Sequence, residues 1–546
     1  MPALGAGYTR PGRAYNIICM PDKYYLRIAF ASDLEKTSER IFYRFLEMLP
    51  GLMTWLSFFG VILLSYFRPI WVSVFIIVFV IYWLSKTMYF SFHLKASYRQ
   101  MKQHREIDWL GKLNKLGAAS NGLPVRHWQE IYHLVVLPMY KEPDEVVRDS
   151  LKSLLETDYP KDRMIVILAQ EERAGDDFNN NLTQKISREF QNSFFRFFIT
   201  VHPKDRSGEI AAKSSNETWA ARTGEELISG LNIPFEKVIF SSFDIDTVVS
   251  PNYFSCLTYH YLTTPKPLRT SFQPIPLFLN NVWQAPGISR IFSFSSSFWH
   301  LTNQERPEKL ITFSSHSMPF KALVDVGFKQ TDVVSDDSRI FWQCLFYYDG
   351  DYRVEPLHCP ISMDANAAET LRRTLIHMYK QQRRWAYGAA EIAYFTFGFL
   401  KNKKISFKRK IALAFEIIEG QWNWACAPIL IFVLGWLPVY LGGAEFTQTI
   451  FSYNLPKILG RILAVSMLGL VMSMYYTFYL LPPKPDTKRQ KLNLLWACSQ
   501  WILLPFTMIF FVALPAIDAQ TRLLLGKYMG FWPTPKHRKA IKQPSN

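Results

Sequence analysis

The sequence predicts an α/β domain inserted between membrane-spanning and interfacial helices, and three observations support this fold class. Long apolar runs occur near the N-terminus and again in the last third of the chain. Between them, short apolar segments alternate with helical patterns, as in domains built on a largely parallel sheet. Basic residues gather where the apolar runs end, as they do on the cytosolic flanks of membrane helices. With 546 residues, the chain is also too long for one ordinary core.

Two nearly uninterrupted apolar runs, 51–67 and 70–92, are separated by an Arg-Pro pair. Each approaches the roughly 20 residues that a helix needs to cross hydrocarbon. We therefore expect a transmembrane hairpin over 51–92, preceded by a cytosolic or interfacial segment, 1–50. A basic stretch follows the hairpin, and the positive-inside rule places it in the cytosol. Since the first residues contain no apolar core followed by a small-residue cleavage site, we expect no cleavable signal peptide.

The segment 93–363 has the pattern of a cytosolic α/β domain. Residues 133–140 (HLVVLPMY) and 163–168 (RMIVIL) are predicted to form buried strands, and 197–201 and 237–243 are predicted to form two more. Apolar residues at helical spacing separate these strands. We therefore expect helices that connect the strands of a largely parallel sheet.

The last third of the chain returns to the membrane. We expect interfacial helices over 364–420 and two transmembrane helices over 421–482, because basic flanks enclose two long apolar runs. The next apolar stretch, 483–520, is interrupted by two prolines. A single crossing there would leave the basic tail, 521–546, outside the cell. We therefore expect a re-entrant or interfacial segment, followed by a cytosolic tail.

Composition narrows the class of partner. Lys and Arg outnumber Asp and Glu by 62 to 45, which gives a formal charge of +17. Because the basic residues cluster at membrane flanks and not on one domain face, we expect membrane lipids as partners and no nucleic acid. The six cysteines contain no CxxC pair. We expect reduced thiols, with neither a zinc site nor a disulfide framework.

Two carboxylates follow the predicted strand 237–243 directly, at Asp244 and Asp246. Residues two apart on an extended backbone point to the same side, and α/β sheets bind ligands beyond the carboxyl ends of their strands. Two such oxygens can hold Mg²⁺ or Mn²⁺ against a diphosphate. By itself the pattern also fits a solvated turn.

Downstream, Ser335, Asp336 and Asp337 precede an amphipathic helical pattern. An aspartate at this position can take the proton from an acceptor hydroxyl as it attacks an anomeric carbon. An ordinary helix N-cap is the simpler alternative, because Ser and Asp are favoured caps.

A third group lies at the end of a helical pattern that starts near residue 365. Gln381, Arg384 and Trp385 stand at i, i+3 and i+4, so they share one face of a helix. An amide, a guanidinium and an indole on one face suit a sugar acceptor and a diphosphate leaving group. The alternative is an interfacial helix that Arg and Trp anchor at lipid headgroups.

The ordered set of a buried strand, Asp-x-Asp, Ser-Asp-Asp and Gln-x-x-Arg-Trp between membrane segments resembles the processive branch of glycosyltransferase family 2. This branch includes cellulose, chitin and hyaluronan synthases, and the resemblance covers about 131–536. It implies a GT-A fold for the nucleotide-sugar-binding domain, with Asp246 as metal ligand and Asp244 near donor and metal. It also implies that Asp337 is the catalytic base. The residues that it places at the acceptor and the leaving diphosphate are Asp336, Gln381, Arg384 and Trp385.

Four segments correspond to the parts of this family that bind the nucleotide-sugar donor. LPMYKEP resembles the opening strand and loop of the family, and AAKSSN resembles its lysine segment. At AQEERAG, acidic residues stand where the family usually has an Asp-rich turn that reads the base. FWPTPK resembles the gating loop of cellulose synthases. The residues expected to bind the donor are therefore Tyr140, Glu142, Glu171 or Glu172, Lys213, Asp244, Thr534 and Lys536.

The resemblance implies an inverting, metal-dependent hexosyltransferase that uses Mg²⁺ or Mn²⁺ at the cytosolic face of the plasma (inner) membrane. We expect a UDP-sugar as donor and a glycan or lipid as acceptor, with a growing polysaccharide as the first choice. His316 is expected to line the acceptor pocket, although a structural histidine is the simpler interpretation. Two alternatives stay open: a non-processive enzyme that makes a glycolipid or polyprenyl-phosphate-linked sugar, and an inactive membrane transporter or scaffold. The size of the product would distinguish the first alternative from a polysaccharide synthase, and metal-dependent sugar transfer would exclude the second.

Overall fold

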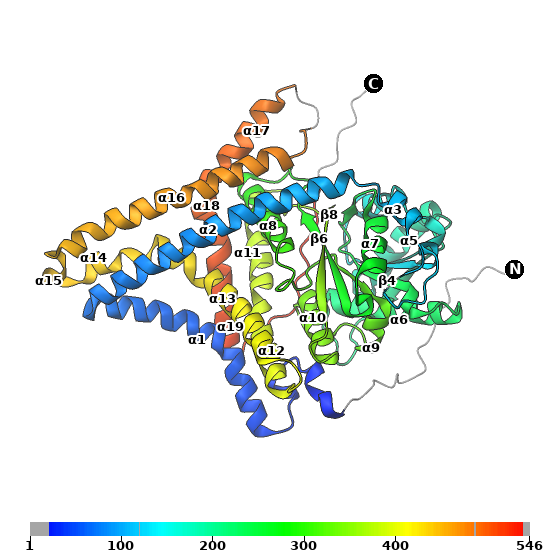
Figure 1. Ribbon diagram of the computed structural model, residues 1–546, viewed down its shortest axis with the longest axis horizontal. Coiled ribbons are helices and arrows are strands. Elements are labelled where there is room, and N and C mark those ends of the chain that lie inside the picture. The colour runs from blue at the N-terminus through cyan, green and yellow to red at the C-terminus, as the bar shows by residue number, and fades with distance from the viewer. Residues whose placement is uncertain (1–20, 120, 485–487, 539–546) are drawn as a thin grey trace.

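The computed structural model describes residues 21–119, 121–484 and 488–538. Parts of the expected N-terminal segment and basic tail, 1–20 and 539–546, lie outside the described residues. Long helices extend to one side of the molecule, and a sheet domain lies on the other (Figure 1). Helices α11, α18 and α19 stand between the two parts.

The sheet domain contains one eight-stranded mixed sheet with the order β3-β2-β1-β4-β7-β6-β8-β5. Its strands are β1 (Tyr132–Pro138), β2 (Met164–Glu171), β3 (Arg196–His202), β4 (Val238–Ser242), β5 (Val248–Val249), β6 (Thr270–Leu277), β7 (Ser317–Pro319) and β8 (Arg353–Ser362). The first four are the strands that the sequence predicts, and they pair in parallel. β1 and β2 are nearly continuous apolar runs because helices cover both faces of the sheet there, whereas the edge strand β3 is partly exposed.

The other half of the sheet is also largely parallel, as expected: β6 and β8 pair in parallel, and in the described sheet only the short strands β7 and β5 run the other way. β7 pairs antiparallel with β4 and β6, and β5 pairs antiparallel with β8. In the last pair Val248 lies opposite Ser362. This register brings the residues that follow β8 beside those that follow β4, which places Asp364 next to Asp246.

Eight helices of the described chain belong to the sheet domain. They are α3 (Trp109–Lys115), α4 (Asp144–Leu155), α5 (Asp176–Phe190), α6 (Lys213–Gly230), α7 (Tyr253–Thr263), α8 (Gly287–Gln304), α9 (Phe320–Asp325) and α10 (Asp336–Tyr347). Two of them begin at residues singled out from the sequence, Lys213 and Asp336. Their N-termini therefore point these side chains and their neighbours toward the end of β4.

The remaining helices form the membrane-facing part. They are α1 (Thr37–Phe67), α2 (Pro69–Glu106), α11 (Leu371–Ala386), α12 (Glu391–Lys401), α13 (Phe407–Phe432), α14 (Leu437–Leu441), α15 (Gly443–Thr447), α16 (Ile450–Leu480), α17 (Gln490–Ser499), α18 (Leu504–Met508) and α19 (Leu514–Leu524). Both helices of the N-terminal hairpin extend beyond the expected apolar runs. The polar end of α2 continues into the sheet domain, where it contacts β8.

Among the described residues, four helical stretches are long and apolar enough to cross a membrane: α1, α2, α16 and residues 490–524. A fifth candidate is the pair α13 and α14, which bend by 48° at the break between them. These helices place the α/β domain between membrane segments at both ends of the chain, as the fold class predicted from the sequence requires.

Residues 490–524 differ in direction from the other candidates. They form α17 to α19 with 3₁₀ and π-helical turns between them, and α18 and α19 run across the direction of α2 and α16 (Figure 1). α19 packs between α1 and α11, where the Thr54 hydroxyl donates a hydrogen bond to Gln520 at 2.6 Å. One nearly continuous helical run thus covers most of the segment that the sequence predicts to be re-entrant or interfacial, and its place relative to the bilayer stays a prediction.

Candidate active site

The two carboxylates that follow β4 face different partners. Asp246 is fully buried, and its Oδ2 lies 2.6 Å from Nζ of Lys536. The backbone N–H of Asp364 donates to the same oxygen at 2.9 Å. The other oxygen, Oδ1, is buried and has no hydrogen-bond partner among the described residues. A buried carboxylate oxygen without a partner is expected where a ligand completes the site.

Asp244 connects the β4 end to the α6 N-terminus. Its Oδ1 lies 2.6 Å from Nζ of Lys213, and its Oδ2 accepts a hydrogen bond from the Ser314 hydroxyl at 2.6 Å. Asp244 is about one quarter exposed, whereas Asp246 is not exposed. Of the two carboxylates, Asp244 is therefore the more open to a ligand that arrives from solvent.

Asp337 lies at the N-terminus of α10, where the helix dipole favours a negative charge. Its Oδ1 is 3.4 Å from Nζ of Lys213 and 3.1 Å from Nζ of Lys329. Nδ1 of His316 lies 4.0 Å from the same oxygen. Lys213 thus lies between Asp337 and Asp244, so two motifs separated by more than 90 residues of sequence meet at one ammonium group.

The two neighbouring aspartates, Asp336 and Asp337, differ in the direction of their pKa shifts. Burial raises the pKa of the Asp337 carboxyl, but Lys213 and Lys329 outweigh burial and hold that pKa below its ordinary value. For Asp336, burial and then the charge of Asp337 raise the pKa to about 7. Burial and then Lys329 lower the pKa of His316 to about 3, so its ring is neutral at physiological pH. Asp337 is therefore the member of the pair that stays ionised.

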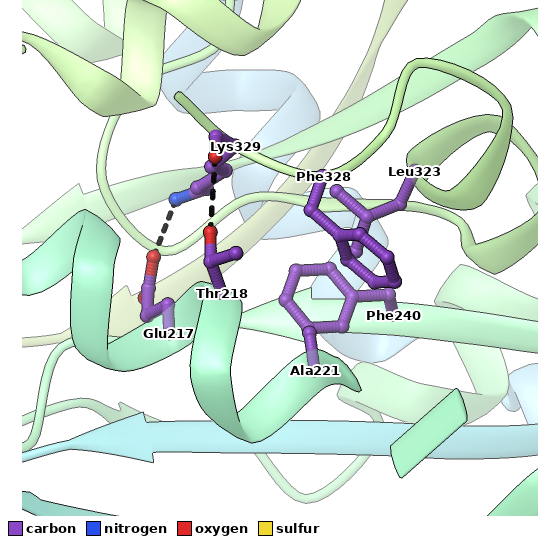
Figure 2. A pocket seen from close by; sticks show the side chains of 7 residues that line it. All are labelled: Glu217, Thr218, Ala221, Phe240, Leu323, Phe328 and Lys329. Carbon is purple, nitrogen blue, oxygen red and sulfur yellow. Dashed lines mark hydrogen bonds and ion pairs between the residues drawn. The ribbon is translucent and has the colours of Figure 1, made fainter. Parts of the chain in front are cut away.

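Lys329 is a buried cation that sequence reasoning missed. Its Nζ lies 2.6 Å from Oε2 of Glu217, 3.3 Å from Oδ2 of Asp336 and 3.1 Å from Oδ1 of Asp337. Figure 2 shows its ammonium reaching Glu217, beside the rings of Phe240 and Phe328. Asp336, expected at the acceptor, instead lies behind Asp337 with its carboxylate on Lys329.

We predict that Lys329→Met destabilises the protein more at pH 8 than at pH 6. The loss leaves the buried Glu217 and Asp336 without their cation, which costs about 3–5 kcal/mol. The fold raises the pKa of the Asp336 carboxyl above its ordinary value. Protonation of this carboxyl at low pH removes its buried charge, so acid relieves part of the cost. The relief is lost as the pH rises. Thermal unfolding of both proteins in detergent at the two pH values measures the difference.

A compensating variant controls for general misfolding. Lys329→Met combined with Glu217→Gln removes one charge of each sign, so it is expected to recover part of the lost unfolding temperature. An equal deficit at both pH values, with no recovery in the double variant, would show that the charge balance of this cluster does not govern its stability.

The Gln381, Arg384 and Trp385 side chains remain near one another on α11 but contact different neighbours. The Gln381 amide oxygen accepts a hydrogen bond from Asn366 at 3.2 Å. The Arg384 guanidinium lies 4.7 Å from the ring centre of Phe531, and its buried Nε has no partner among the described residues. Burial lowers the pKa of Arg384, while the charges of three site carboxylates oppose this shift. The Arg384 guanidinium is therefore within electrostatic range of the site carboxylates.

Trp385 closes the apolar side of this group. Its ring lies 5.8 Å from that of Phe292 and 6.3 Å from that of Phe278. An indole packed between these rings is well placed to form an apolar wall of a sugar site, and the alternative of an interfacial anchor stays open. The acceptor role of Trp385 stays a prediction.

The segment after α19, residues 525–538, runs from the membrane-facing helices past the sheet domain (Figure 1). Lys536 reaches Asp246, and two residues later Arg538 binds Asp364, with Nη2 at 2.6 Å from Oδ1. These two ion pairs hold the segment over the end of β4. The gating-loop-like sequence therefore lies at the site where the sequence predicts the donor diphosphate.

Polar groups of the same segment remain available beside these ion pairs. The Thr534 hydroxyl is buried and has no partner among the described residues. The Trp532 ring lies 5.5 Å from that of His377 and 5.2 Å from the ammonium of Lys380, both on α11. The segment thus packs against α11 while it presents a free hydroxyl at the site.

The residues expected at the nucleoside lie at the ends of β1 and β2 or just after them. The backbone N–H of Tyr140 donates to Oε2 of Glu142 at 2.7 Å, and the Arg173 guanidinium lies 4.5 Å from the Tyr140 ring centre. Arg173 also pairs with Glu171, with Nη2 at 3.0 Å from Oε1. Glu172 instead accepts from the Lys204 backbone at 2.9 Å. The sequence left Glu171 and Glu172 open, and the contact with Arg173 favours Glu171.

Asn216 lies in the segment AAKSSN, three residues after Lys213, and has a structural role. The side-chain amide of Asn216 donates to the backbone carbonyl of Ala169 at 2.7 Å and is almost fully buried. It therefore joins α6 to β2, and its amide is not available to a donor.

The chain was compared with known proteins. No family model matches the sequence. A curated relative, the poly-beta-1,6-N-acetyl-D-glucosamine synthase of Staphylococcus epidermidis, is 23% identical over 397 residues, which cover 71% of this chain and 79% of the relative. That relative is named as a synthase of an N-acetyl-D-glucosamine polymer, and such a polymer is made by the transfer of sugar units. The chain is a glycosyltransferase.

Two solved structures are similar to this chain, with low sequence identity and low TM-scores. A mannosyltransferase from Pyrobaculum calidifontis in complex with GDP-Man and Mn²⁺ superposes with a TM-score of 0.41, at 14% identity over 83% of this chain and 100% of that chain. S. aureus TarS 1-349 in complex with UDP-GlcNAc gives a TM-score of 0.33, at 10% identity over 73% of this chain and 93% of that chain. Because both scores are below 0.5, the assignment of a GT-A fold depends on the sheet and site described above.

Proposed function

We propose that this glycosyltransferase is an inverting, metal-dependent enzyme that moves a sugar from a UDP-sugar to a growing polysaccharide at the cytosolic face of the plasma membrane. The observation that carries this proposal is the meeting of four separate motifs. Lys213 lies between Asp244 and Asp337, and Lys536 contacts Asp246. Groups for a donor, a leaving diphosphate and a proton acceptor are thus collected around the end of β4.

The donor atoms at this position fit a divalent cation. Asp244 and Asp246 offer carboxylate oxygens, which Mg²⁺ and Mn²⁺ prefer, and one oxygen of Asp246 is buried without a partner among the described residues. When bound there, Mg²⁺ or Mn²⁺ would neutralise negative charge on the diphosphate. Lys213 pairs with Asp244 and Lys536 pairs with Asp246. Once a divalent cation neutralises these carboxylates, both ammonium groups can move to the phosphates of the donor.

Asp337 is proposed as the general base. It takes the proton from the acceptor hydroxyl, whose oxygen attacks the anomeric carbon on the face opposite the diphosphate, and the configuration is inverted. Lys213 and Lys329 keep this carboxylate ionised but also reduce its basicity. A diphosphate that draws Lys213 toward itself would therefore make Asp337 a stronger base once the donor is bound. Arg384 is a further cation that faces the leaving group.

We predict that Lys536→Met raises the KM for the donor roughly tenfold, because it removes one charge-assisted contact of about 1.5–3 kcal/mol. The ion pair with Asp246 holds the 525–538 segment over the site, so the variant should also be cut faster in this segment by limited proteolysis. Initial rates at varied donor concentration, together with the digestion pattern, measure both effects.

Lys527→Met is the matched control, because Lys527 lies exposed in the same segment. It is expected to keep the KM and the digestion rate of the unmodified protein. If Lys536→Met also kept both, the segment would have no part in donor binding.

The charge pattern supports a cytosolic position for the domain. Basic residues follow the apolar part of α2, precede α13 and follow α16, and these ends all lie on the side of the sheet domain (Figure 1). We propose that α1, α2, the α13–α14 pair and α16 cross the bilayer and that residues 490–524 lie along its cytosolic surface. Their direction across α2 and α16 supports this arrangement.

A polysaccharide is proposed as the product because the curated relative is named as a polysaccharide synthase. The test incubates the purified protein in nanodiscs with UDP-, GDP- and TDP-sugars and Mn²⁺, and then sizes the product. We expect UDP-dependent formation of a ladder of chain lengths. A single glycolipid product would establish non-processive transfer instead, and no transfer from any donor would contradict the proposed activity.

A further inference from the structure

A group of histidine and cysteine side chains lies where α2 enters the sheet domain, apart from the carboxylates that follow β4. His104 comes from the end of α2, and Cys256 and His260 come from α7. One candidate ligand atom of each lies within 4.8 Å of those of the other two. Cys256 is fully buried, whereas both histidines are partly exposed. The group is thus buried on one side and open to solvent on the other.

The two α7 residues stand at i and i+4, so they point to the same side of the helix. Nε2 of His260 is buried and has no hydrogen-bond partner among the described residues. An imidazole nitrogen in this situation lacks the water or protein partner that it would otherwise need. A metal ion would satisfy it.

His104 is held by a neighbouring carbonyl. Its Nδ1 lies 3.0 Å from the carbonyl oxygen of Leu357, and a carbonyl can only accept a hydrogen bond. Nδ1 therefore carries the proton, which leaves the lone pair of the neutral ring on Nε2. Bonding of one ring nitrogen to a carbonyl is the usual arrangement for a histidine whose other nitrogen binds a metal.

The backbone of β8 is distorted next to this group. One residue of β6 lies opposite three residues of β8, because Gln273 pairs with Pro356 while Ile275 pairs with Pro360. At the centre of this bulge, His358 has φ +49°, a conformation that costs energy for a residue with a side chain. The distortion presents the Leu357 carbonyl to His104. It also brings Cys359 near Cys256, with the Cys359 thiol 3.2 Å from the Ser250 hydroxyl.

We propose that His104, Cys256 and His260 bind a structural Zn²⁺ ion, and that the Cys359 thiol leaves the Ser250 hydroxyl to become the fourth ligand. Two imidazoles and two thiolates are a common zinc set, whereas the carboxylates at the β4 end suit harder cations. The ion would join α2, α7 and β8, which lie far apart in the sequence. It would thereby fix the cytosolic end of the membrane hairpin to the catalytic domain. This proposal does not depend on the reaction that the domain catalyses.

This proposal departs from the expectation of no zinc site. The sequence shows no sign of one because the ligands come from three separate segments, and only Cys256 and His260 are close in the chain. Zinc sites are usually found in a sequence as two closely spaced pairs of ligands, and this C-x-x-x-H segment is only one such pair. Without the fold, it has no visible partner.

Metal analysis of the full-length protein, purified in detergent with a thiol reductant, tests the proposal. We expect about one zinc ion per chain, as for a closed structural site. Cys256→Ser and His260→Gln should each lose most of it. Two controls should keep it: Cys344→Ser, which removes a buried thiol of α10, and Asp246→Asn, which removes a proposed ligand of the catalytic metal.

A second measurement needs no variant. The unmodified protein is stripped with chelator and reloaded with Co²⁺, which gives thiolate charge-transfer and intense tetrahedral absorption bands if cysteine and histidine bind it. Removal of the metal should also lower the unfolding temperature, because the ion joins three segments. Less than stoichiometric zinc together with a Co²⁺ spectrum that lacks thiolate bands would overturn the proposal. A disulfide between Cys256 and Cys359 in the reduced preparation would also overturn it.

Discussion

Replacing Asp337 by asparagine is expected to abolish turnover while donor binding persists. The variant keeps the size of the side chain but removes the group that accepts the proton, and general base catalysis typically contributes about 10²–10⁴-fold in rate. Asp337 contacts Lys213 and Lys329 but not the carboxylate of Asp246, so the proposed metal position is unchanged. Transfer assays and donor-binding measurements in the presence of Mn²⁺ separate the two effects.

Asp325→Asn is the matched control for this variant. Asp325 also lies in the sheet domain, where it pairs with Lys321 on α9 away from the site. It should keep the rate of the unmodified enzyme. Retained turnover in Asp337→Asn would remove that residue from the base role.

Asp246→Asn is expected to abolish turnover and also to weaken metal-dependent donor binding. Even residues that only support a metal ligand typically cost 10–100-fold in affinity when they are changed, so a ligand should cost at least about tenfold. The variant also leaves Lys536 beside a neutral amide, which removes the ion pair that fixes the 525–538 segment. Donor binding with and without Mn²⁺ measures the metal-dependent part.

Asp351→Asn provides the comparison for this second variant. Asp351 pairs with Lys266 and Arg269 at an exposed edge of the domain. Its loss should leave Mn²⁺-dependent binding as it is. If Asp246→Asn bound donor and Mn²⁺ as well as the unmodified protein does, the metal would have to bind elsewhere.

The first four strands of the sheet were predictable from sequence because they are short, largely apolar runs, of which β1 and β2 are the most continuous. The strands predicted at 133–140, 163–168, 197–201 and 237–243 differ from the observed ones by a few residues at their ends. Buried parallel strands carry this signal themselves, and the helices between them show clear 3.6-residue periodicity. The position of the two aspartates beyond the last of these strands followed directly.

The other half of the sheet was not predicted, because prolines obscure its strands. β6 contains Pro274 and Pro276, and β8 contains Pro356 and Pro360. Proline ordinarily argues against a central strand, and these strands accommodate it at a bulge. The pairing of β8 with β5, which brings Asp364 to Asp246, therefore depends on the tertiary fold.

Lys329 and Arg538 were missed for a related reason. An isolated lysine eight residues before Asp337 looks like an exposed loop residue in the sequence, yet the fold buries it among three carboxylates. Arg538 belongs to a basic tail, where a contact with the distant Asp364 has no local signal. Sequence patterns identify residues that share one element, whereas these contacts join elements that are distant in the chain.

A structure of the protein in nanodiscs with UDP and Mn²⁺ tests the proposed site most directly. We expect Mn²⁺ between Asp246 and the diphosphate, with Lys213 or Lys536 moved onto the phosphates and Asp337 facing the open position beyond them. Nucleotide bound elsewhere on the domain, with Asp244 and Asp246 still paired only to the two lysines, would contradict the assignment.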